Sequence, residues 1–344
     1  MTLDAAGPED DSSSSGSGSG SGSGSKAVGR PLRLGTRASL LATRQSEWVA
    51  GRLRAASGEA VELVPMTSQG DLLRGSLASL GGTGVFATAL RDALRAHECD
   101  LVVHSLKDLP TAPTPGLTLA AIPERELAND VLCARDGLRL ADLPPNAVVG
   151  TGSPRRTAQL LRARPDLRVT DIRGNIDTRL GKVQSGEFDA VVLAAAGLRR
   201  IGRADAASEQ FALGSWPSSA GQGALAIEVR ADDHRMLALA GLLADPVATA
   251  TARLERALLG ALEAGCAAPL GISTELLPAG VKLVAEVYSL DGMRTVRVER
   301  TLTMQQAQSA ERTAAQLRDE LLAAGAAELA PLGSAGRPGA GELG

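Results

Sequence analysis

The chain has 344 residues, enough for two or three domains, and its 36 Lys and Arg against 39 Asp and Glu give a formal net charge of −3. That balance argues against a basic surface for nucleic acid or an anionic membrane, and an aromatic content of 2 % argues against stacking platforms for single strands. Hydrophobic residues make up 44 % of the chain, so the core must consist mostly of Ala, Leu and Val.

The numbers and spacing of cysteines and histidines argue against a disulfide-stabilised protein and against a metal-binding one. The three cysteines, Cys99, Cys133 and Cys266, are too few and scattered for a disulfide framework and suit a reducing cytosol. With no CxxC spacing and three scattered histidines, no metal site is expected. The N-terminus lacks a basic segment followed by an apolar one, and no apolar stretch is long enough to span a bilayer, so we expect a cytoplasmic protein without a membrane partner.

Both ends of the chain have the composition of flexible coil. Residues 1–29 are predicted to be a tail, because Ser12 to Ser25 is almost pure Ser and Gly and cannot bury a core. Residues 331–344 are rich in Gly, Pro and Ala and are predicted to be loose as well.

Between these tails, predicted strands and helices alternate. The strands are short apolar runs: Leu32 to Gly35, Val61 to Val64, a strand from Leu101, Val131 to Ala134, Ala147 to Gly150, one near Val169, and Ala190 to Ala194. The helices have apolar faces at Leu41, Trp48, Val49 and Leu53, at Phe86, Leu90, Ala93 and Leu94, after Pro154, and over Thr178 to Val183. This alternation indicates βαβ units and sheets rich in parallel pairs.

The pattern changes near residue 246, where a small α+β unit is predicted. Its first helix has a face formed by leucines and is expected to end at Gly265 as a C-cap. Apolar residues then alternate from Val281 to Val287, and the turn at Asp291-Gly292 predicts an antiparallel hairpin. A final helix carries three leucines. The leucines of the two helices are Leu254, Leu258, Leu259 and Leu262, and Leu317, Leu321 and Leu322.

The stretch from Asp100 to Pro110 ends a buried strand with a charged pair, Lys107–Asp108. Two interpretations are open on this segment alone. The pair is a surface ion pair of little energetic value, or it belongs to a ligand site, because ligands of open α/β sheets bind beyond the carboxyl ends of the strands.

Arginines gather where other predicted strands end. After Gly150, Ser153 can cap a helix and Pro154 suits its first position, so free backbone N–H groups with Arg155 and Arg156 close by predict an anion site. Two cations at a helix N-terminus oppose the helix dipole and cost stability unless an anion is present. The alternative is an ordinary capped helix with two solvated arginines.

The same pattern recurs at Arg173 and Arg179, at Arg199-Arg200, and at Arg37 near the start of the globular part. Each single arginine is readily explained as a solvated side chain. Their recurrence at strand ends predicts a cleft for a small molecule with several carboxylates or phosphates, which the planar guanidinium binds in bidentate fashion. The loop from Gly81 to Phe86 lacks the ending of a P-loop, and it is either a mobile segment that covers the cleft or a plain hairpin-like loop.

Seven motifs occur in an order that resembles one family. They are Thr36-Arg37-Ala38-Ser39, Gly81 to Phe86, Val103 to Pro110, Gly150 to Arg156, Arg173-Gly174-Asn175 through Arg179, Ala220 to Gly223, and Gly265 to Gly271. From about Arg33 to about Ala330 the chain resembles porphobilinogen deaminase, also called hydroxymethylbilane synthase, a transferase of tetrapyrrole biosynthesis. The resemblance implies condensation of four porphobilinogens with loss of four ammonia molecules to give hydroxymethylbilane, by a monomeric enzyme.

The resemblance also implies a three-domain fold. Two α/β domains like type II periplasmic binding proteins would span 30–125 with 224–242 and 126–223. A small α+β domain at 246–330 would carry a dipyrromethane cofactor, built from substrate and attached by a thioether to Cys266. By residue type alone Cys266 does not stand out, because a lone thiol is more often an inert buried group, as we expect for Cys99 and Cys133.

Site roles follow from the same resemblance. Asp108 is the expected catalytic residue, which stabilises the cation formed on deamination, hydrogen-bonds the pyrrole N–H groups and assists departure of the amine. The expected ligands of the cofactor are Cys266, Lys107, Asp108, Ser39, Thr151, Ser153, Arg155, Arg156 and Gly174. The expected ligands of the substrate are Arg37, Ser39, Arg173, Arg179 and Arg200.

Three positions depart from the common family pattern. Thr83 stands where Lys is frequent, Gln69 where Arg is frequent and Gly152 where Ser is frequent. The resemblance therefore assigns no site role to these three positions, and activity is expected to survive the changes. Two other functions are alternatives: a non-enzymatic carboxylate-binding module, which would need no Cys266 and usually an export signal, and a nucleic-acid binder, which the low aromatic content and the net charge disfavour.

Overall fold

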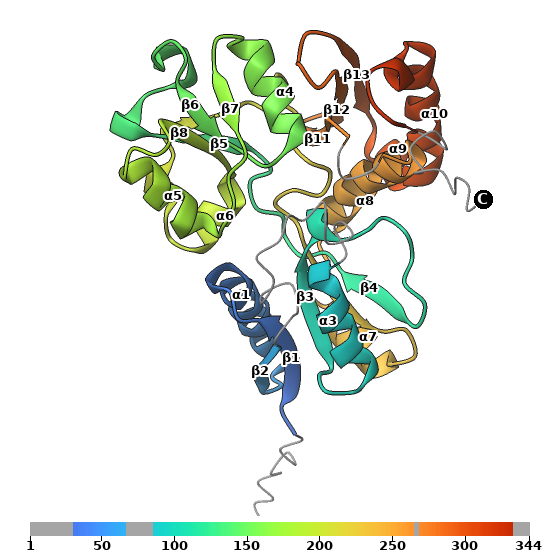
Figure 1. The fold of residues 1–344 in the computed structure, drawn as a ribbon. Coiled ribbons are helices and arrows are strands. Elements are labelled where there is room, and N and C mark those ends of the chain that lie inside the picture. The colour runs from blue at the N-terminus through green and yellow to red at the C-terminus, as the bar shows by residue number, and fades with distance from the viewer. Residues whose placement is uncertain (1–29, 67–84, 265–267, 333–344) are drawn as a thin grey trace, which may run out of the picture. The chain divides into compact units, whose positions relative to one another are not determined.

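The computed structural model describes residues 30–66, 85–264 and 268–332, shown as coloured ribbon in Figure 1. Met1–Arg30 is separate from the body of the chain, Pro31–Gly344, which contains all described helices and strands. The predicted N-terminal tail and the loop at 81–84 fall outside the described residues. Leu332, at the start of the predicted C-terminal tail, is 4 % exposed and packs in a core, so that tail begins later than expected.

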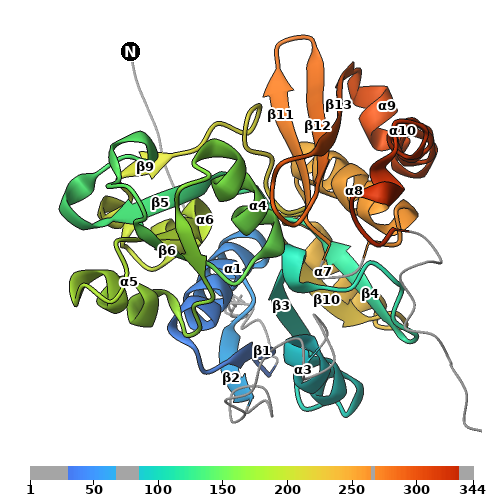
Figure 2. The ribbon, with the colours of Figure 1, turned by 45° about the horizontal axis from the view of Figure 1, so that its top comes forward.

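The first sheet has the strand order β2-β1-β3-β10-β4. β1 pairs in parallel with β2 and β3, whereas β10 runs antiparallel to β3 and β4. Helices α1 and α7 share one core with the sheet, and α3 packs with Val102 in another (Figures 1 and 2). The elements are β1 Leu32–Arg37, α1 Leu40–Ser57, β2 Val61–Met66, α3 Val85–Arg95, β3 Leu101–Ser105, β4 Leu117–Ala121, β10 Leu225–Arg230 and α7 His234–Gly241.

The second sheet repeats this arrangement with the order β7-β6-β8-β5-β9. β6 pairs in parallel with β7 and β8, and β5 runs antiparallel to β8 and β9. Helix α4 packs in one core of this sheet, and α5 and α6 in the other. The elements are β5 Asp130–Ala134, β6 Val148–Gly150, α4 Pro154–Ala163, β7 Arg168–Thr170, α5 Ile176–Gln184, β8 Ala190–Ala194, α6 Ala195–Arg200 and β9 Glu209–Gln210.

The chain passes between the two sheets twice, at 122–129 and at 211–224. The strands next to these passages, β5 and β10, are the ones that run antiparallel to their neighbours. Both sheets are therefore mixed, which corrects the expectation of mainly parallel pairing. The runs Leu101–Ser105 and Ala190–Ala194 are apolar without alternation because both of their faces are covered.

The third unit is a three-stranded antiparallel sheet with the order β11-β12-β13, packed against α8 and α10. Its hairpin is confirmed, with Tyr288 opposite Thr295. The unit consists of α8 Pro246–Ala261, β11 Leu270–Leu277, β12 Gly280–Tyr288, β13 Thr295–Leu302, α9 Met304–Gln308 and α10 Ala310–Ala323. The fold class expected from the sequence is thus confirmed: two α/β sheets with their covering helices, followed by a small C-terminal α+β part.

Several local predictions were wrong. Helix α8 ends at Ala261 with Leu262 as its cap, not at Gly265, and the residue with left-handed backbone is Glu263 at φ 47°. Strands β4, β9, β10 and β11 and helices α6, α7 and α9 were not predicted from the sequence. β10 escaped notice because its run contains Glu228 and Arg230, both charged yet buried by partners from other elements.

Within the described residues no single helix is both long enough and apolar enough to cross a bilayer. Helices α7 and α8 have the required length and composition only when taken together, and a bend of 109° separates them.

Candidate functional site

The loop after β3 carries the Lys107–Asp108 pair on a single 3-10 turn, Leu106–Asp108. Arg256 of α8 holds this loop by its backbone: Nη1 donates to the carbonyls of Leu106 and Leu109 at 3.1 and 2.9 Å, and Nη2 donates to that of Pro110 at 2.6 Å. Burial lowers the pKa of Arg256, as does the positive charge of Arg91. A helix of the third unit therefore fixes the backbone on which both charged side chains stand.

Lys107 and Asp108 point to different surroundings. Lys107 Nζ donates to Gln222 Oε1 at 3.2 Å, and removal from solvent lowers the pKa of Lys107. The Asp108 side chain is exposed, and within residues 30–66, 85–264 and 268–332 it makes no hydrogen bond or ion pair. The two side chains do not pair with each other within those residues, so the interpretation as a surface ion pair is wrong.

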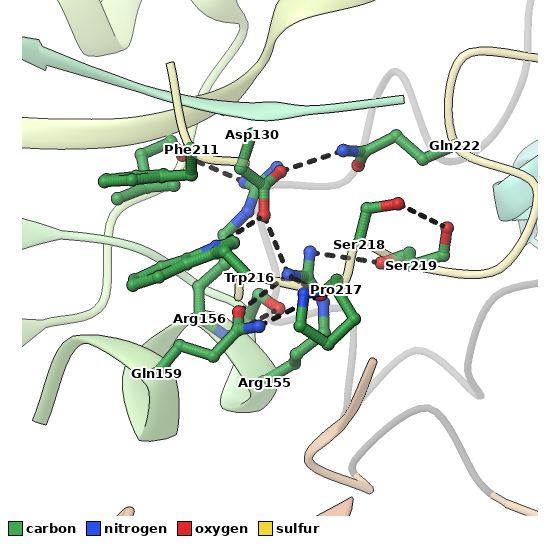
Figure 3. Close-up of polar contacts among 12 residues, drawn as sticks. Asp130, Arg155, Arg156, Gln159, Phe211, Trp216, Pro217, Ser218, Ser219 and Gln222 are labelled. Carbon is green, nitrogen blue, oxygen red and sulfur yellow. Dashed lines mark hydrogen bonds and ion pairs between the residues drawn. The ribbon is translucent and has the colours of Figure 1, made fainter. Parts of the chain in front are cut away.

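Asp130 is the centre of a buried charge cluster at the start of β5 (Figure 3). Its side chain is fully buried, and its oxygens accept from Arg155 Nη1 at 2.7 Å and from Arg156 Nη2 at 2.6 Å. Trp216 Nε1 adds a third donor at 3.2 Å, and Gln222 Nε2 a fourth at 2.9 Å. Burial alone raises the pKa of Asp130, but the two guanidiniums outweigh it and hold that pKa well below its usual range.

Arg155 and Arg156 are 3 % and 7 % exposed, so the interpretation as solvated arginines is wrong. Ser153 caps α4 as predicted, since its Oγ accepts from Arg156 N at 3.4 Å, with Pro154 in the first turn. The anion that two cations at a helix N-terminus require is Asp130, a residue of the protein itself. The Nε atoms of both arginines are buried and have no hydrogen-bond partner in the described part of the chain.

The remaining contacts of the two arginines bring in other segments. Arg155 Nη1 also donates to Gln159 Oε1 at 2.8 Å and to the Pro217 carbonyl at 3.1 Å. Arg156 Nη1 donates to the Val192 carbonyl of β8 at 2.9 Å. Both guanidiniums are thus oriented before any ligand arrives.

A second group of predicted residues follows β7 and is more exposed. Arg173 Nε donates to Asp171 at 2.9 Å, and both side chains are about half-exposed. Arg179 Nε donates to the carbonyl of Gly174 at 2.9 Å. Burial lowers the pKa of Arg179, and the charges of Arg156 and Arg173 lower it further, which places Arg179 in the field of both.

The other predicted residues lie at separate positions. Arg37 ends β1, and Ser39 caps α1, accepting from Ala42 N at 3.4 Å. Thr151 is buried and its Oγ1 accepts from Ser153 N at 3.2 Å. Arg200 Nη2 donates to the Gly223 carbonyl at 2.7 Å, and burial lowers the pKa of Arg200 to about 10 against the charge of Glu126.

Of the three departures, only Gly152 lies in the described residues. A Cβ built there would lie 2.8 Å from Asp171 Oδ1, so the space that a larger residue would need is taken by the carboxylate that pairs with Arg173. Thr83, Gln69 and Cys266 lie outside the described residues. Cys99 and Cys133 are buried, and burial raises their thiol pKa values to about 11 and about 12, which fits the inert role expected of them.

Residues 32–238 match the family model "Porphobilinogen deaminase, dipyromethane cofactor binding domain", and residues 249–323 match "Porphobilinogen deaminase, C-terminal domain". The chain belongs to the porphobilinogen deaminase family. Among relatives of the family, porphobilinogen deaminase of Leifsonia xyli subsp. xyli is 54 % identical over 88 % of this chain and 94 % of that protein. That of Thermobifida fusca is 51 % identical over 89 % and 98 %.

Among solved structures, a periplasmic substrate-binding protein of an ABC transporter from Coxiella burnetii aligns with a TM-score of 0.41 at 14 % identity, over 65 % of this chain and 96 % of that one. The assignment of the fold rests on the two matching strand orders, not on this likeness.

The family's cofactor, dipyrromethane, carries acetate and propionate side chains, and the charge cluster fits such a group. Lys107, Arg155 and Arg156 supply three cations against the single buried carboxylate of Asp130. Two guanidinium Nε donors remain buried without a partner in the described residues, where an unmade hydrogen bond is costly. The donor set therefore matches the carboxylates that a porphobilinogen deaminase must hold.

Three residues that hold the candidate site together were not predicted from the sequence: Asp130, Gln222 and Arg256. Asp130 had a usable signal, because two adjacent arginines at a helix start require a counterion and an acid at the start of a buried strand is a candidate. Gln222 lies in the motif from Ala220 to Gly223, but nothing in the sequence indicates what its side chain contacts. Arg256 had no local signal, since its three acceptors are carbonyls at Leu106, Leu109 and Pro110, far away in sequence.

Proposed function

We propose that this protein condenses four porphobilinogen molecules head to tail, releasing four ammonia molecules and giving hydroxymethylbilane. Family membership over both matched segments supports the reaction. The single structural observation that carries it is the cluster of Lys107, Arg155 and Arg156 around Asp130, next in the chain to Asp108, an exposed carboxylate with no partner in the part of the chain that the structure describes. Each porphobilinogen brings two carboxylates, so a growing product needs such an excess of oriented cations.

We propose that dipyrromethane is attached by a thioether to Cys266 and that Lys107, Ser153, Arg155 and Arg156 hold its carboxylates. Ser39, Thr151 and Gly174 are proposed as further contacts. When bound, the cofactor supplies the pyrrole α-carbon to which substrate is added. The protein's part is to keep the guanidiniums in place, which the contacts to Asp130 and Val192 support.

Asp108 is the proposed catalytic residue. Loss of ammonia leaves positive charge on the substrate pyrrole, and a free carboxylate at the end of β3 can stabilise that charge and accept the pyrrole N–H. It can also transfer a proton to the departing amine. The exposed position of Asp108 and its freedom from partners in the described residues support this role. Arg37, Arg173, Arg179 and Arg200 are proposed to bind the carboxylates of the incoming substrate.

The test is to incubate the purified full-length protein with porphobilinogen and to assay ammonia release and a product that cyclises to uroporphyrin I. Intact mass should exceed the sequence mass by one dipyrromethane, and a proteolytic fragment containing Cys266 should carry the increment. Binding of porphobilinogen without release of ammonia would favour a carboxylate-binding module and contradict the proposal.

Asp108→Ala is expected to lower kcat by at least about 10³-fold while leaving the unfolding transition in place, since one electrostatic stabiliser is typically worth about 10²–10³ and the same residue also transfers a proton. Asp232→Ala removes another exposed carboxylate and serves as the matched control, expected to keep full activity. If Asp108→Ala retained most of its turnover, the assignment of Asp108 would be wrong even with the family correct.

We also propose the domain division stated above, at 30–125 with 224–242, 126–223 and 246–330. A cytoplasmic location and a monomeric state stay predictions. Limited proteolysis and size-exclusion chromatography with light scattering would test the boundaries and the monomer.

A further inference from the structure

We propose that Gln222 is a positioning residue, whose side-chain amide joins the ammonium group of Lys107 to the Asp130 cluster so that cations from both sheets act as one carboxylate site. The effect on catalysis rests on the proposed function, whereas the contacts of Gln222 do not depend on it. Lys107 follows β3 of the first sheet and Asp130 begins β5 of the second, and Gln222 contacts both.

The backbone around Gln222 is fixed from two sides. The N–H of Gly221 donates to Glu255 Oε2 of α8 at 2.7 Å, and Arg125 Nε donates to the Gln222 carbonyl at 2.9 Å. Gly223 has φ +85°, and a Cβ there would lie 2.2 Å from the Glu126 carbonyl, so only glycine fits next to Gln222. Residue 222 therefore cannot shift to follow a ligand.

The orientation of the amide is set by its partners. Nε2 donates to the Ala128 carbonyl at 2.7 Å and to Asp130 Oδ1 at 2.9 Å, which uses both of its hydrogens. Oε1 accepts from Lys107 Nζ at 3.2 Å. A flipped amide would set N–H groups against the ammonium and an oxygen against two other oxygens. Gln222 is fully buried, so water cannot compensate for a wrong orientation.

For Lys107, this contact is its one hydrogen bond within the described residues. An ammonium group has three donors, so two remain for ligand carboxylates. The charges that act on Lys107 are the carboxylates of Asp108 and Asp130 and the guanidiniums of Arg155 and Arg156. The neutral amide provides an acceptor without adding a charge to that balance.

The first variant is Gln222→Met, which keeps the length and removes both polar atoms. A hydrogen bond to a charged group is worth more than a neutral one, so we expect kcat/KM to fall by at least about tenfold, mostly in kcat if the bound intermediates are misplaced. Gln184→Met, at an exposed position at the end of α5, is the matched control and should leave the rate unchanged.

The second variant, Gln222→Glu, keeps the shape and adds a titrating group. Its carboxyl would face Lys107 and Asp130, with the charges of Asp108, Arg155 and Arg156 around them and Arg125 and Glu255 on the adjoining backbone. Protonated, it can accept from Lys107 and donate its single O–H to Asp130, and it loses only the amide's second donation, to the Ala128 carbonyl. Ionised, it opposes Asp130 and neutralises Lys107. Activity relative to the unaltered protein at the same pH should therefore rise as pH falls, a dependence that a purely structural role would not give.

The third measurement does not depend on turnover. The chain has four lysines, at 26, 107, 182 and 282, so ¹³Cε-lysine labelling gives few NMR signals, and Lys107→Arg assigns the relevant one. In full-length Gln222→Met protein the titration midpoint of Lys107 should fall below that of the unaltered protein while the other three stay in place. An unchanged Lys107 midpoint together with kcat/KM within about twofold would overturn the inference. If the unaltered protein made no hydroxymethylbilane, the proposed function would fail, and the lysine titration would still decide the role of Gln222.

Discussion

Two groups of arginines in the second sheet differ in what balances their charge. Arg155 and Arg156, after β6, are buried on the carboxylate of Asp130, whereas Arg173, after β7, meets Asp171 at a half-exposed position. Arg155 and Arg156 are held in place by the protein and are shielded from solvent. Arg173 can exchange Asp171 for a ligand carboxylate at little cost, because exposed ion pairs contribute only about 0–1 kcal/mol.

The difference matches two tasks. A cofactor that stays attached through every cycle calls for donors that are fixed beforehand, because a preorganised site loses little free energy to ordering when it binds. A substrate that arrives repeatedly needs donors that can be reached from solvent. We therefore interpret the buried cluster as the cofactor side of the site and the exposed arginines as the substrate side, as the family resemblance implied.

The largest expected effect follows from removing the buried counterion. Asp130→Asn leaves Arg155 and Arg156 without a balancing charge, and breaking a buried pair of this kind typically costs about 3–5 kcal/mol. We expect a loss of that size in the free energy of unfolding, measured by urea denaturation, together with loss of activity. Asp142→Asn, at an exposed position, is the control. A loss below 1 kcal/mol would contradict the cluster as described.

The same carboxylate predicts a pH dependence. Because the folded pKa of Asp130 is depressed, its stabilisation is fully present above the unfolded value, about 3.9, and is lost as pH falls towards the folded value. The stability difference between the unaltered protein and Asp130→Asn should stay constant from pH 7 to about pH 5 and shrink only below that range. Urea titrations at several pH values measure it. A difference that shrank already near pH 6 would point to another group.

A smaller effect is expected at the loop that carries Asp108, the proposed catalytic residue. Arg256→Met removes the guanidinium that donates to three carbonyls around Leu106–Asp108. We expect kcat to fall by about 10–100-fold through misplacement of Asp108, with a stability loss of about 1–3 kcal/mol from the unpaired carbonyls. Arg253→Met on the same helix, at an exposed position, is the control. Unchanged kcat would show that the loop holds its shape without Arg256.

The smallest effect on stability is expected on the exposed side. Arg173→Gln should change the free energy of unfolding by no more than about 0.5 kcal/mol and raise KM for porphobilinogen by about tenfold, because it removes a surface charge that we propose binds a substrate carboxylate. Asp171→Asn, which removes the internal competitor, should lower KM. If Arg173→Gln destabilised the protein as strongly as Asp130→Asn, the contrast between the two groups of arginines would not hold.

Much of the local structure could be predicted from short-range pattern. Ser153 and Pro154 specify the start of α4, and the apolar run Ala190–Ala194 specifies β8, because the cap and the buried strand depend on neighbouring residues. The crossing strands could not be predicted in the same way. β10 contains Glu228, which is buried only because His104 and Arg91, from distant parts of the chain, contact its carboxylate.

The sequence by itself determined the α/β alternation, the excess of arginine at strand ends and, through seven ordered motifs, the family. Those properties depend on residue type and on neighbours along the chain. Only the tertiary structure decided which arginines are buried, that Asp130 is their counterion, and that Gln222 and Arg256 hold the loops of the site. A counterion must lie within a few ångströms in space, and these partners are separated by 25 residues or more along the chain. Local pattern could therefore mark Asp130 as a candidate acid, but it could not show which residues it contacts.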